Sequence, residues 1–184
     1  MSGDVSALEK AVETLRQAFD RGFASPPADA SQAFEDVLTI RLGGAPFALR
    51  LSETAGLHAD RRIVPFPSPV PEFLGLAGLR GQLVPVYHLG VILGQGAAAA
   101  PRWFVAARGA NAIGLAFDVF EAHVRAPKSA FAADLSPATA RGHVRGAVRI
   151  NGTAHPVIDL ASVLEAISQR AARRAAPKER ASHD

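Results

Sequence analysis

A repeat within the chain restricts its fold more than any other feature: residues 73–93 recur 71 positions later without a gap. In the first copy, two short apolar runs, Leu74–Leu79 and Leu83–Tyr87, flank a turn that contains Arg80 and Gly81. Two strands too short to be helices, with glycine between them, are typical of a β-hairpin. Six residues are identical in the two copies and pair as Gly75 with Gly146, Gly81 with Gly152, Pro85 with Pro156, Val86 with Val157, Leu89 with Leu160 and Leu93 with Leu164. The glycines mark equivalent turns, and the prolines mark equivalent positions at a sheet edge or bulge because proline has no N–H to donate.

The segments upstream of the two copies also correspond, at a shift near 66 residues. Residues 38–51 alternate between apolar and polar side chains around a turn at Gly43, and residues 103–117 resemble them around Gly109. The chain is therefore predicted to contain two similar units, about 34–94 and 102–168, each with two hairpins and a short helix. Units of this length close most easily as five-stranded barrels. We expect a mainly β fold, with two five-stranded SH3-like barrels packed side by side.

The segments between the hairpins give weaker signals. Residues 52–59 are expected to hold one helical turn, residues 62–66 a short strand, and residues 119–125 an extension of the second upstream hairpin. His88 is interpreted as the cap of the short helix that follows it, and Asp118 and Glu121 as members of a solvated strand end.

Both ends of the chain are predicted to be helical. Residues 1–33 are expected to form an N-terminal amphipathic helix over 4–22 and a proline-rich linker, because apolar residues recur there at spacings of three and four. This helix could pack on its own domain or bind a partner. Asp159 is placed as the N-cap of a C-terminal helix that runs into a basic tail, residues 169–184. The tail accounts for the whole net charge of +3, so we expect no nucleic-acid surface on the folded body. The tail itself is either a solvated end or a contact for an acidic partner, an anionic lipid or a nucleic acid.

Several classes of protein are disfavoured by the residues that are present. The absence of cysteine excludes disulfides and thiolate zinc sites, and no two of the six histidines are four residues apart, so we expect no metal and no cofactor. Residues 94–99 match a G-x-G-x-x-A dinucleotide pattern, but Pro101 would break the helix that must follow it. No nucleophile motif or phosphate-binding loop is found, and we do not expect an enzyme. There is no apolar run of roughly 18 residues and no secretion signal, which predicts a cytoplasmic protein.

The first copy of the repeat resembles the core motif of the CheW-like coupling proteins of bacterial chemosensory systems. The resemblance is carried by Phe73 to Gly81 together with Val84-Pro85-Val86, and by the second copy with its Pro-Val-Ile-Asp-Leu ending, and it covers about residues 34–168. It implies two five-stranded barrels and a non-enzymatic adaptor. The implied partners are the regulatory domain of a CheA-type histidine kinase and the cytoplasmic tip of a chemoreceptor, with the membrane reached only through the receptors.

The resemblance also implies where partners bind. It places the arginine of an LRG motif, here Arg80, at the binding surface together with its neighbours Leu79 and Gly81. Leu57 and Arg62 are the other residues expected to contact a partner. The alternatives from the residues themselves are an exposed turn arginine without a role for Arg80, and a core position for Leu57.

The sequence departs from the family pattern in two places. Thr54-Ala55-Gly56-Leu57 replaces a segment that usually carries a glutamate, and His88 replaces an aspartate that the second copy keeps as Asp159. Two functions are therefore expected in order. The first is coupling of receptors to the kinase, and the second is a divergent protein outside the receptor array that binds another signalling protein through its N-terminal helix. Nucleic-acid binding through the tail comes third.

Overall fold

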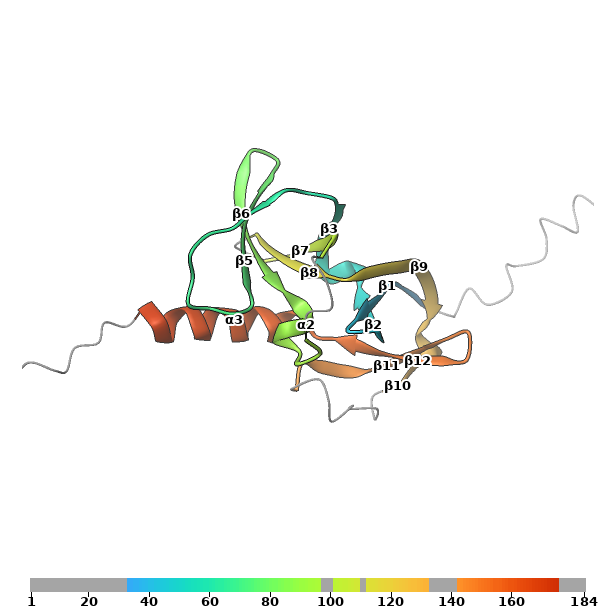
Figure 1. Cartoon of the computed structure of the whole chain (residues 1–184). Coiled ribbons are helices and arrows are strands. Elements are labelled where there is room, and N and C mark those ends of the chain that lie inside the picture. Colours follow the sequence, from blue (N-terminus) through green and yellow to red (C-terminus); the bar gives the residue numbers. More distant parts are fainter. Residues whose placement is uncertain (1–32, 97–100, 110–111, 133–141, 176–184) are drawn as a thin grey trace, which may run out of the picture. The chain divides into compact units, whose positions relative to one another are not determined.

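The computed structural model describes residues 33–96, 101–109, 112–132 and 142–175, and the chain forms two six-stranded mixed sheets in this part (Figure 1). The first sheet has the order β10-β11-β12-β2-β1-β9, and its strands are β1 (Phe34–Leu42), β2 (Ala45–Arg50), β9 (Val119–Pro127), β10 (Phe131–Ala132), β11 (Val144–Ile150) and β12 (Thr153–Ile158). The second has the order β3-β7-β8-β6-β5-β4, and its strands are β3 (Thr54–Ala59), β4 (Ile63–Val64), β5 (Phe73–Leu79), β6 (Gln82–His88), β7 (Trp103–Ala107) and β8 (Ile113–Phe117). The helices are η1 (Leu51–Glu53), α2 (Leu89–Ile92), η2 (Lys128–Ala130) and α3 (Leu160–Ala175). The predicted N-terminal helix and linker lie outside the described residues, apart from Ala33.

The mainly β class and the internal repeat are confirmed, but each sheet combines strands from both repeats. The hairpin β1–β2 pairs through β2 with β12 of the second copy, and the hairpin β7–β8 pairs through β8 with β6 of the first copy. Both cross-pairs are parallel and share one register, since Val157 lies opposite Ala48 and Val86 lies opposite Gly114. The stretches 34–94 and 102–168 therefore do not each form a sheet. A parallel neighbour cannot be reached through a tight turn, so the local hairpin pattern does not indicate it.

The repeated prolines lie where a third strand joins each hairpin. Pro85 pairs with Leu76 of β5, and pairing of β6 with β8 begins at the next residue, Val86. Pro156 likewise precedes Val157, where β12 meets β2. Each proline thus occupies a position that has a strand partner on one side only, although its strand is interior to the sheet. This agrees with the missing N–H of proline.

The strand β9 and the segment 52–59 differ from the predictions. β9 does not extend the hairpin β7–β8 but crosses to the first sheet, where it pairs along β1. Residues 54–59 form β3 rather than a helical turn, and only η1 is helical there. Each sheet also has a sixth strand beyond the expected five, and in each sheet a strand of two residues, β4 or β10, lies at one end of the order.

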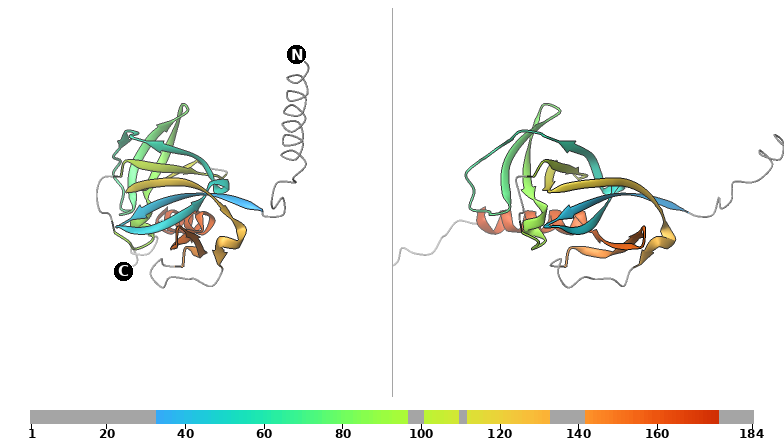
Figure 2. Two further views of the ribbon diagram at one scale, coloured as in Figure 1. Left: turned by 90° about the vertical axis from the view of Figure 1, so that its right-hand side faces the viewer. Right: turned by 45° about the vertical axis from the view of Figure 1, so that its right-hand side comes forward.

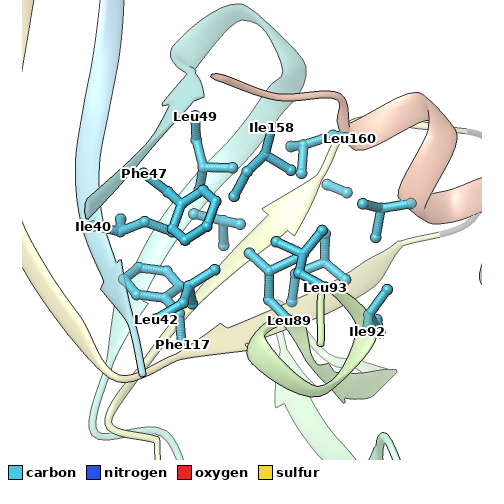
Figure 3. Close-up of a cluster of buried hydrophobic side chains, with 14 of the residues drawn as sticks. Ile40, Leu42, Phe47, Leu49, Leu89, Ile92, Leu93, Phe117, Ile158 and Leu160 are labelled. Atoms are coloured by element: carbon cyan, nitrogen blue, oxygen red, sulfur yellow. The ribbon is translucent and has the colours of Figure 1, made fainter. Parts of the chain in front are cut away.

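The largest buried cluster lies between the two sheets, and Figure 3 shows side chains of β1 and β2 facing those of α2, β8 and the start of α3. Its members include Ile40, Leu42, Phe47, Leu49, Leu89, Ile92, Leu93, Phe117, Ile158 and Leu160. A smaller cluster lies within each sheet: Val37, Ala48, Ala126, Val148 and Val157 in the first, and Ala77, Val86, Phe104 and Ala116 in the second. Each sheet thus has a core of its own, and both sheets share the main one.

The helix α3 is held at both ends. At its start, the backbone N–H of Ser162 donates to Oδ1 of Asp159 at 3.3 Å, which confirms the predicted N-cap. Near its other end, Arg170 donates to the buried carboxylate of Glu72 at 2.5 Å, in the loop before β5. Figure 1 shows this loop reaching down to α3. Residues 169–175 of the basic tail therefore continue the helix. No helix of the described part is long and apolar enough to cross a membrane.

Truncation of a shared core residue should destabilise the whole protein. Leu89 is 0% exposed in the main cluster, so we expect Leu89→Ala to lower the free energy of unfolding by about 2–5 kcal/mol. Leu83 is 74% exposed, and Leu83→Ala is the matched control, with an expected change within about 0.5 kcal/mol. Urea denaturation of both variants checks this, and an equal loss in the two would contradict the placement of the core.

Candidate functional site

The turn between β5 and β6 borders an open hollow at one end of the second sheet. The hollow has a volume of about 190 Å³ and lies among β3, this turn and the turn that follows β7. It is lined by Ala55, His58, Leu79, Arg80, Gln82, Val84, Ala106, Ala107, Arg108, Gly109 and Ala112. Figure 2 shows the hairpin β5–β6, in green, projecting beyond the neighbouring strands in both views. We call this feature the β5–β6 hollow.

The turn between β5 and β6 has two successive residues with positive φ angles. Leu79 pairs with Gln82, which leaves Arg80 and Gly81 as a two-residue loop with φ of 49° and 79°. The equivalent loop in the second copy has nearly the same angles, 49° and 80°, at Asn151 and Gly152. Such type I′ turns favour Asn-Gly, because asparagine tolerates the left-handed conformation better than residues with longer side chains. Arginine at position 80 therefore carries backbone strain that its counterpart avoids.

Arg80 is exposed at the rim of the hollow and pairs with no carboxylate among the described residues. Leu79 is half-buried and forms part of the wall. Gly81 is exposed and completes the turn. These three predicted residues thus lie together at one edge of the hollow.

The other two predicted residues do not line the hollow. Leu57 is half-buried and packs against the main core cluster, opposite Val105 of β7. Its neighbour His58 faces the hollow instead, because successive side chains of a strand point to opposite faces. Arg62 is exposed in the short connection between β3 and β4.

His58 is a site residue that the sequence analysis did not identify. Its ring packs on Phe104 with centroids 5.0 Å apart, and its Nε2 lies so close to Gly56 that a Cβ there would approach it to 3.1 Å. Burial, followed by the charges of Arg61 and Arg80, lowers the pKa of His58 below its ordinary value. His58 is therefore a neutral hydrogen-bonding group at pH 7. Recognition of β3 as an alternating strand would have placed it on the face opposite Leu57.

Arg108 is the second residue that the sequence analysis missed. It follows β7, and its backbone N–H donates to the carbonyl of Glu53 at 2.9 Å. Its Nη2 donates to the carbonyl of Thr54 at 3.3 Å, which holds the guanidinium beside the start of β3. Among the described residues that line the hollow, the charged and titratable side chains are thus two arginines and a histidine, and none is a carboxylate.

A second polar site is buried where the chain crosses between the sheets. His88 stands at the N-cap of α2 but makes no side-chain cap hydrogen bond, and its side chain is only 3% exposed. Its Nε2 lies 3.7 Å from Oδ1 of Asp118, too far for a hydrogen bond, while the backbone N–H of Gly43 donates to Oδ2 at 2.8 Å. Asp118 is 8% exposed, so its prediction as part of a solvated strand end was wrong. Burial lowers the pKa of His88, although the charge of Asp118 acts in the opposite direction.

Neither site has the composition of a metal centre. In the described ranges, no group of three or more His, Cys, Asp or Glu side chains is arranged so that it could hold a metal ion. None of the described residues that line the β5–β6 hollow carries a carboxylate, and its arginines cannot lose their protons to act as ligands. Its arrangement suits the binding of an external anionic or hydrogen-bonding group.

Comparisons with known proteins bear on the fold and the family. The family model of the CheW-like domain matches residues 36–168. Among solved structures, the scaffolding protein TtCheW from Thermoanaerobacter tengcongensis is similar with a TM-score of 0.61 and 15% sequence identity, over 68% of this chain and 89% of that one. No curated protein matches the sequence.

The strain at Arg80 can be tested by exchanging the two turn residues. We expect Arg80→Asn to raise the free energy of unfolding by about 0.5–1 kcal/mol, because asparagine relieves the left-handed strain, and Asn151→Arg to lower it by a similar amount. Urea denaturation measures both changes. Changes of opposite sign in the two variants support equivalent backbone strain in the two turns. A lower free energy of unfolding in Arg80→Asn would show that contacts of the arginine side chain stabilise the fold by more than the strained backbone destabilises it.

The buried His88 predicts a pH-dependent stability. A histidine whose folded-state pKa is lowered binds its proton more readily in the unfolded chain, so its contribution is complete above the unfolded pKa of about 6.5 and is lost as the pH falls towards the folded value. The free energy of unfolding should therefore fall by up to about 1.4 kcal/mol per pH unit below pH 6.5. His88→Gln should reduce this slope, as measured by urea denaturation between pH 5.5 and 7.5. The control is His123→Gln on the surface of β9, and an unchanged slope in His88→Gln would refute the prediction.

Proposed function

Because the chain belongs to the CheW-like domain family, we propose that it is an adaptor that couples chemoreceptors to a CheA-type histidine kinase in a chemosensory pathway. It acts by binding, and we assign it no catalytic step. Its partners are the regulatory domain of the kinase and the cytoplasmic tip of a receptor. The protein works in the cytoplasm and reaches the membrane only through receptors.

The observation that carries this proposal is the state of Arg80. Its guanidinium is exposed beside the hollow and has no carboxylate partner in the part of the chain that the structure describes, and its backbone is held in a conformation that arginine adopts at a cost. Arginine is enriched among residues that dominate the energy of protein interfaces. A strained, unpaired arginine at the rim of a hollow is therefore a reasonable anchor for a partner.

The proposed mechanism is simultaneous binding of two partners to one rigid body. The two sheets share the main core, so a contact made on one sheet is held in a constant position relative to the other. An adaptor of this kind raises the local concentration of one partner near the other, and any change in the bound receptor reaches the kinase through their common attachment.

Charge reversal at the turn tests the assignment. We expect Arg80→Glu to weaken binding of the kinase regulatory domain, the receptor fragment or both by about tenfold or more, as measured by calorimetry with purified proteins. Arg149→Glu is the matched control, because Arg149 is an exposed arginine beside the equivalent turn of the second copy, and it should change either affinity less than about twofold.

Two outcomes would count against the proposal. Binding of neither partner by the unmodified protein at tens of micromolar would remove the adaptor role, and normal binding by Arg80→Glu would remove Arg80 from the interface. Deletion of residues 1–33 addresses the alternative of a divergent protein outside the receptor array. Loss of all partner binding on this deletion would favour that alternative, whereas unchanged kinase binding supports the adaptor.

A further inference from the structure

We propose that the β5–β6 hollow receives a carboxylate-bearing segment of a protein partner, with Arg80, Arg108 and His58 around the carboxylate. The partner's identity rests on the proposed function, but the class of ligand follows from the hollow alone. The three side chains come from three separate parts of the second sheet, namely β3, the turn between β5 and β6, and the end of β7. Their convergence on one small volume is what the proposal explains.

The two arginines of the hollow have no carboxylate partner among the described residues, as is also true of Arg61, Arg62, Arg125 and Arg149, but these two line one small volume. Five arginines elsewhere pair with carboxylates, as Arg41 with Glu121, Arg50 with Glu35, Arg102 with Asp60, Arg145 with Asp159 and Arg170 with Glu72. In the hollow, Arg108 has only a 3.3 Å hydrogen bond to a carbonyl, and Arg80 has no ion pair within the described ranges. Several guanidinium donors are thus available to one external anion, and arginine binds carboxylates through paired donors.

The walls of the hollow are apolar. Leu79, Val84, Ala106 and Ala107 contribute to its lining, and the last three of these are buried. Apolar walls lower the local dielectric constant and strengthen an ion pair formed against them. A volume of about 190 Å³ suits a single short side chain rather than an extended polymer.

The surroundings favour a protein over other polyanions. Leu83 is 74% exposed next to the turn, on the face of β6 opposite the lining residues Gln82 and Val84, and Val64 and Phe66 are 53% and 61% exposed at β4, which pairs with β5, and just after it. Exposed apolar residues on the strands that carry a charged site are typical of protein interfaces, whereas a nucleic acid or a lipid surface requires a broad basic stripe. The proposed ligand is therefore an aspartate or glutamate side chain in a partner segment that also presents apolar residues.

His58 makes the binding pH-dependent. In the free protein its ring packs on Phe104 of β7, and burial, followed by the charges of Arg61 and Arg80, lowers its pKa. A bound carboxylate opposes the two arginine charges and raises the pKa of His58, so binding takes up a proton. Affinity should consequently rise as the pH falls from 8 to 6, a range in which the carboxylate of the ligand stays ionised.

The test is an NMR titration of the full-length ¹⁵N-labelled protein with an N-acetylated hexaglutamate peptide. We expect shifts at the backbone amides around His58, Arg80 and Arg108, weak affinity that is about two- to fivefold higher at pH 6 than at pH 8, and no shifts with hexalysine. Arg80→Gln and Arg108→Gln should each weaken binding about three- to tenfold. Arg149→Gln, the control in the second copy, should not, and His58→Gln should remove the dependence on pH.

The outcomes separate this inference from the proposed function. Shifts confined to parts of the protein outside the hollow, or an equal loss in Arg149→Gln, would overturn the site, and equal shifts with inorganic phosphate would overturn its selectivity for carboxylates. If the kinase domain or the receptor fragment binds while hexaglutamate leaves the hollow unperturbed, the inference fails and the adaptor role stands. If the peptide binds at the hollow and neither protein partner binds, the ligand class stands and the adaptor role fails. A variant that does not fold leaves the mapping on the unmodified protein as the deciding measurement.

Discussion

The parallel pairing between the two repeats is the contact on which the rest of the structure depends. Through it, the hairpin β1–β2 joins β12 and the hairpin β7–β8 joins β6, in equivalent register. Neither repeat can complete a sheet alone, so we expect the two repeats to fold together. The main hydrophobic cluster strengthens this dependence, since it takes residues from both sheets and from α2 and α3. A protein built in this way is expected to unfold as one unit, without a stable half.

Much of the fold follows from local sequence, and the remainder depends on distant contacts. The hairpins around Arg80 and Asn151 were predicted because short apolar runs and turn glycines are local signals, and the strands agree within a residue or two. The strand β3 was missed because Thr54–Ala59 contains small residues and little β-branched character. The crossing of β9 to the first sheet was missed because its partner β1 is some 80 residues away, and no local pattern encodes that pairing.

The candidate site shows the same division. Leu79, Arg80 and Gly81 could be identified because they form one turn, and their resemblance to a family motif is continuous in sequence. His58 and Arg108 could not, because they meet only through the pairing of β3 with β7, in which Thr54 lies opposite Ala107. Leu57 was predicted to contact a partner from family resemblance alone, and the structure packs it against the core on the face opposite His58. A family motif can be assigned to a residue in sequence, but the face of the strand on which that residue lies depends on the pairing of distant strands.

The cross-pairing also has a consequence for synthesis on the ribosome. The strands of the second sheet are contiguous in the chain, from Thr54 to Phe117, so all of them emerge before the first sheet can be completed. The first sheet begins with β1 at Phe34 but is complete only with β12, which ends at Ile158. The strands synthesised first therefore remain without this partner until β12 has been synthesised. At translation rates of about 5–20 residues per second, that wait lasts roughly 5–25 seconds. During it, the hairpin β1–β2 lacks its parallel partner β12, and its apolar side chains are exposed to aggregation until the shared core is complete.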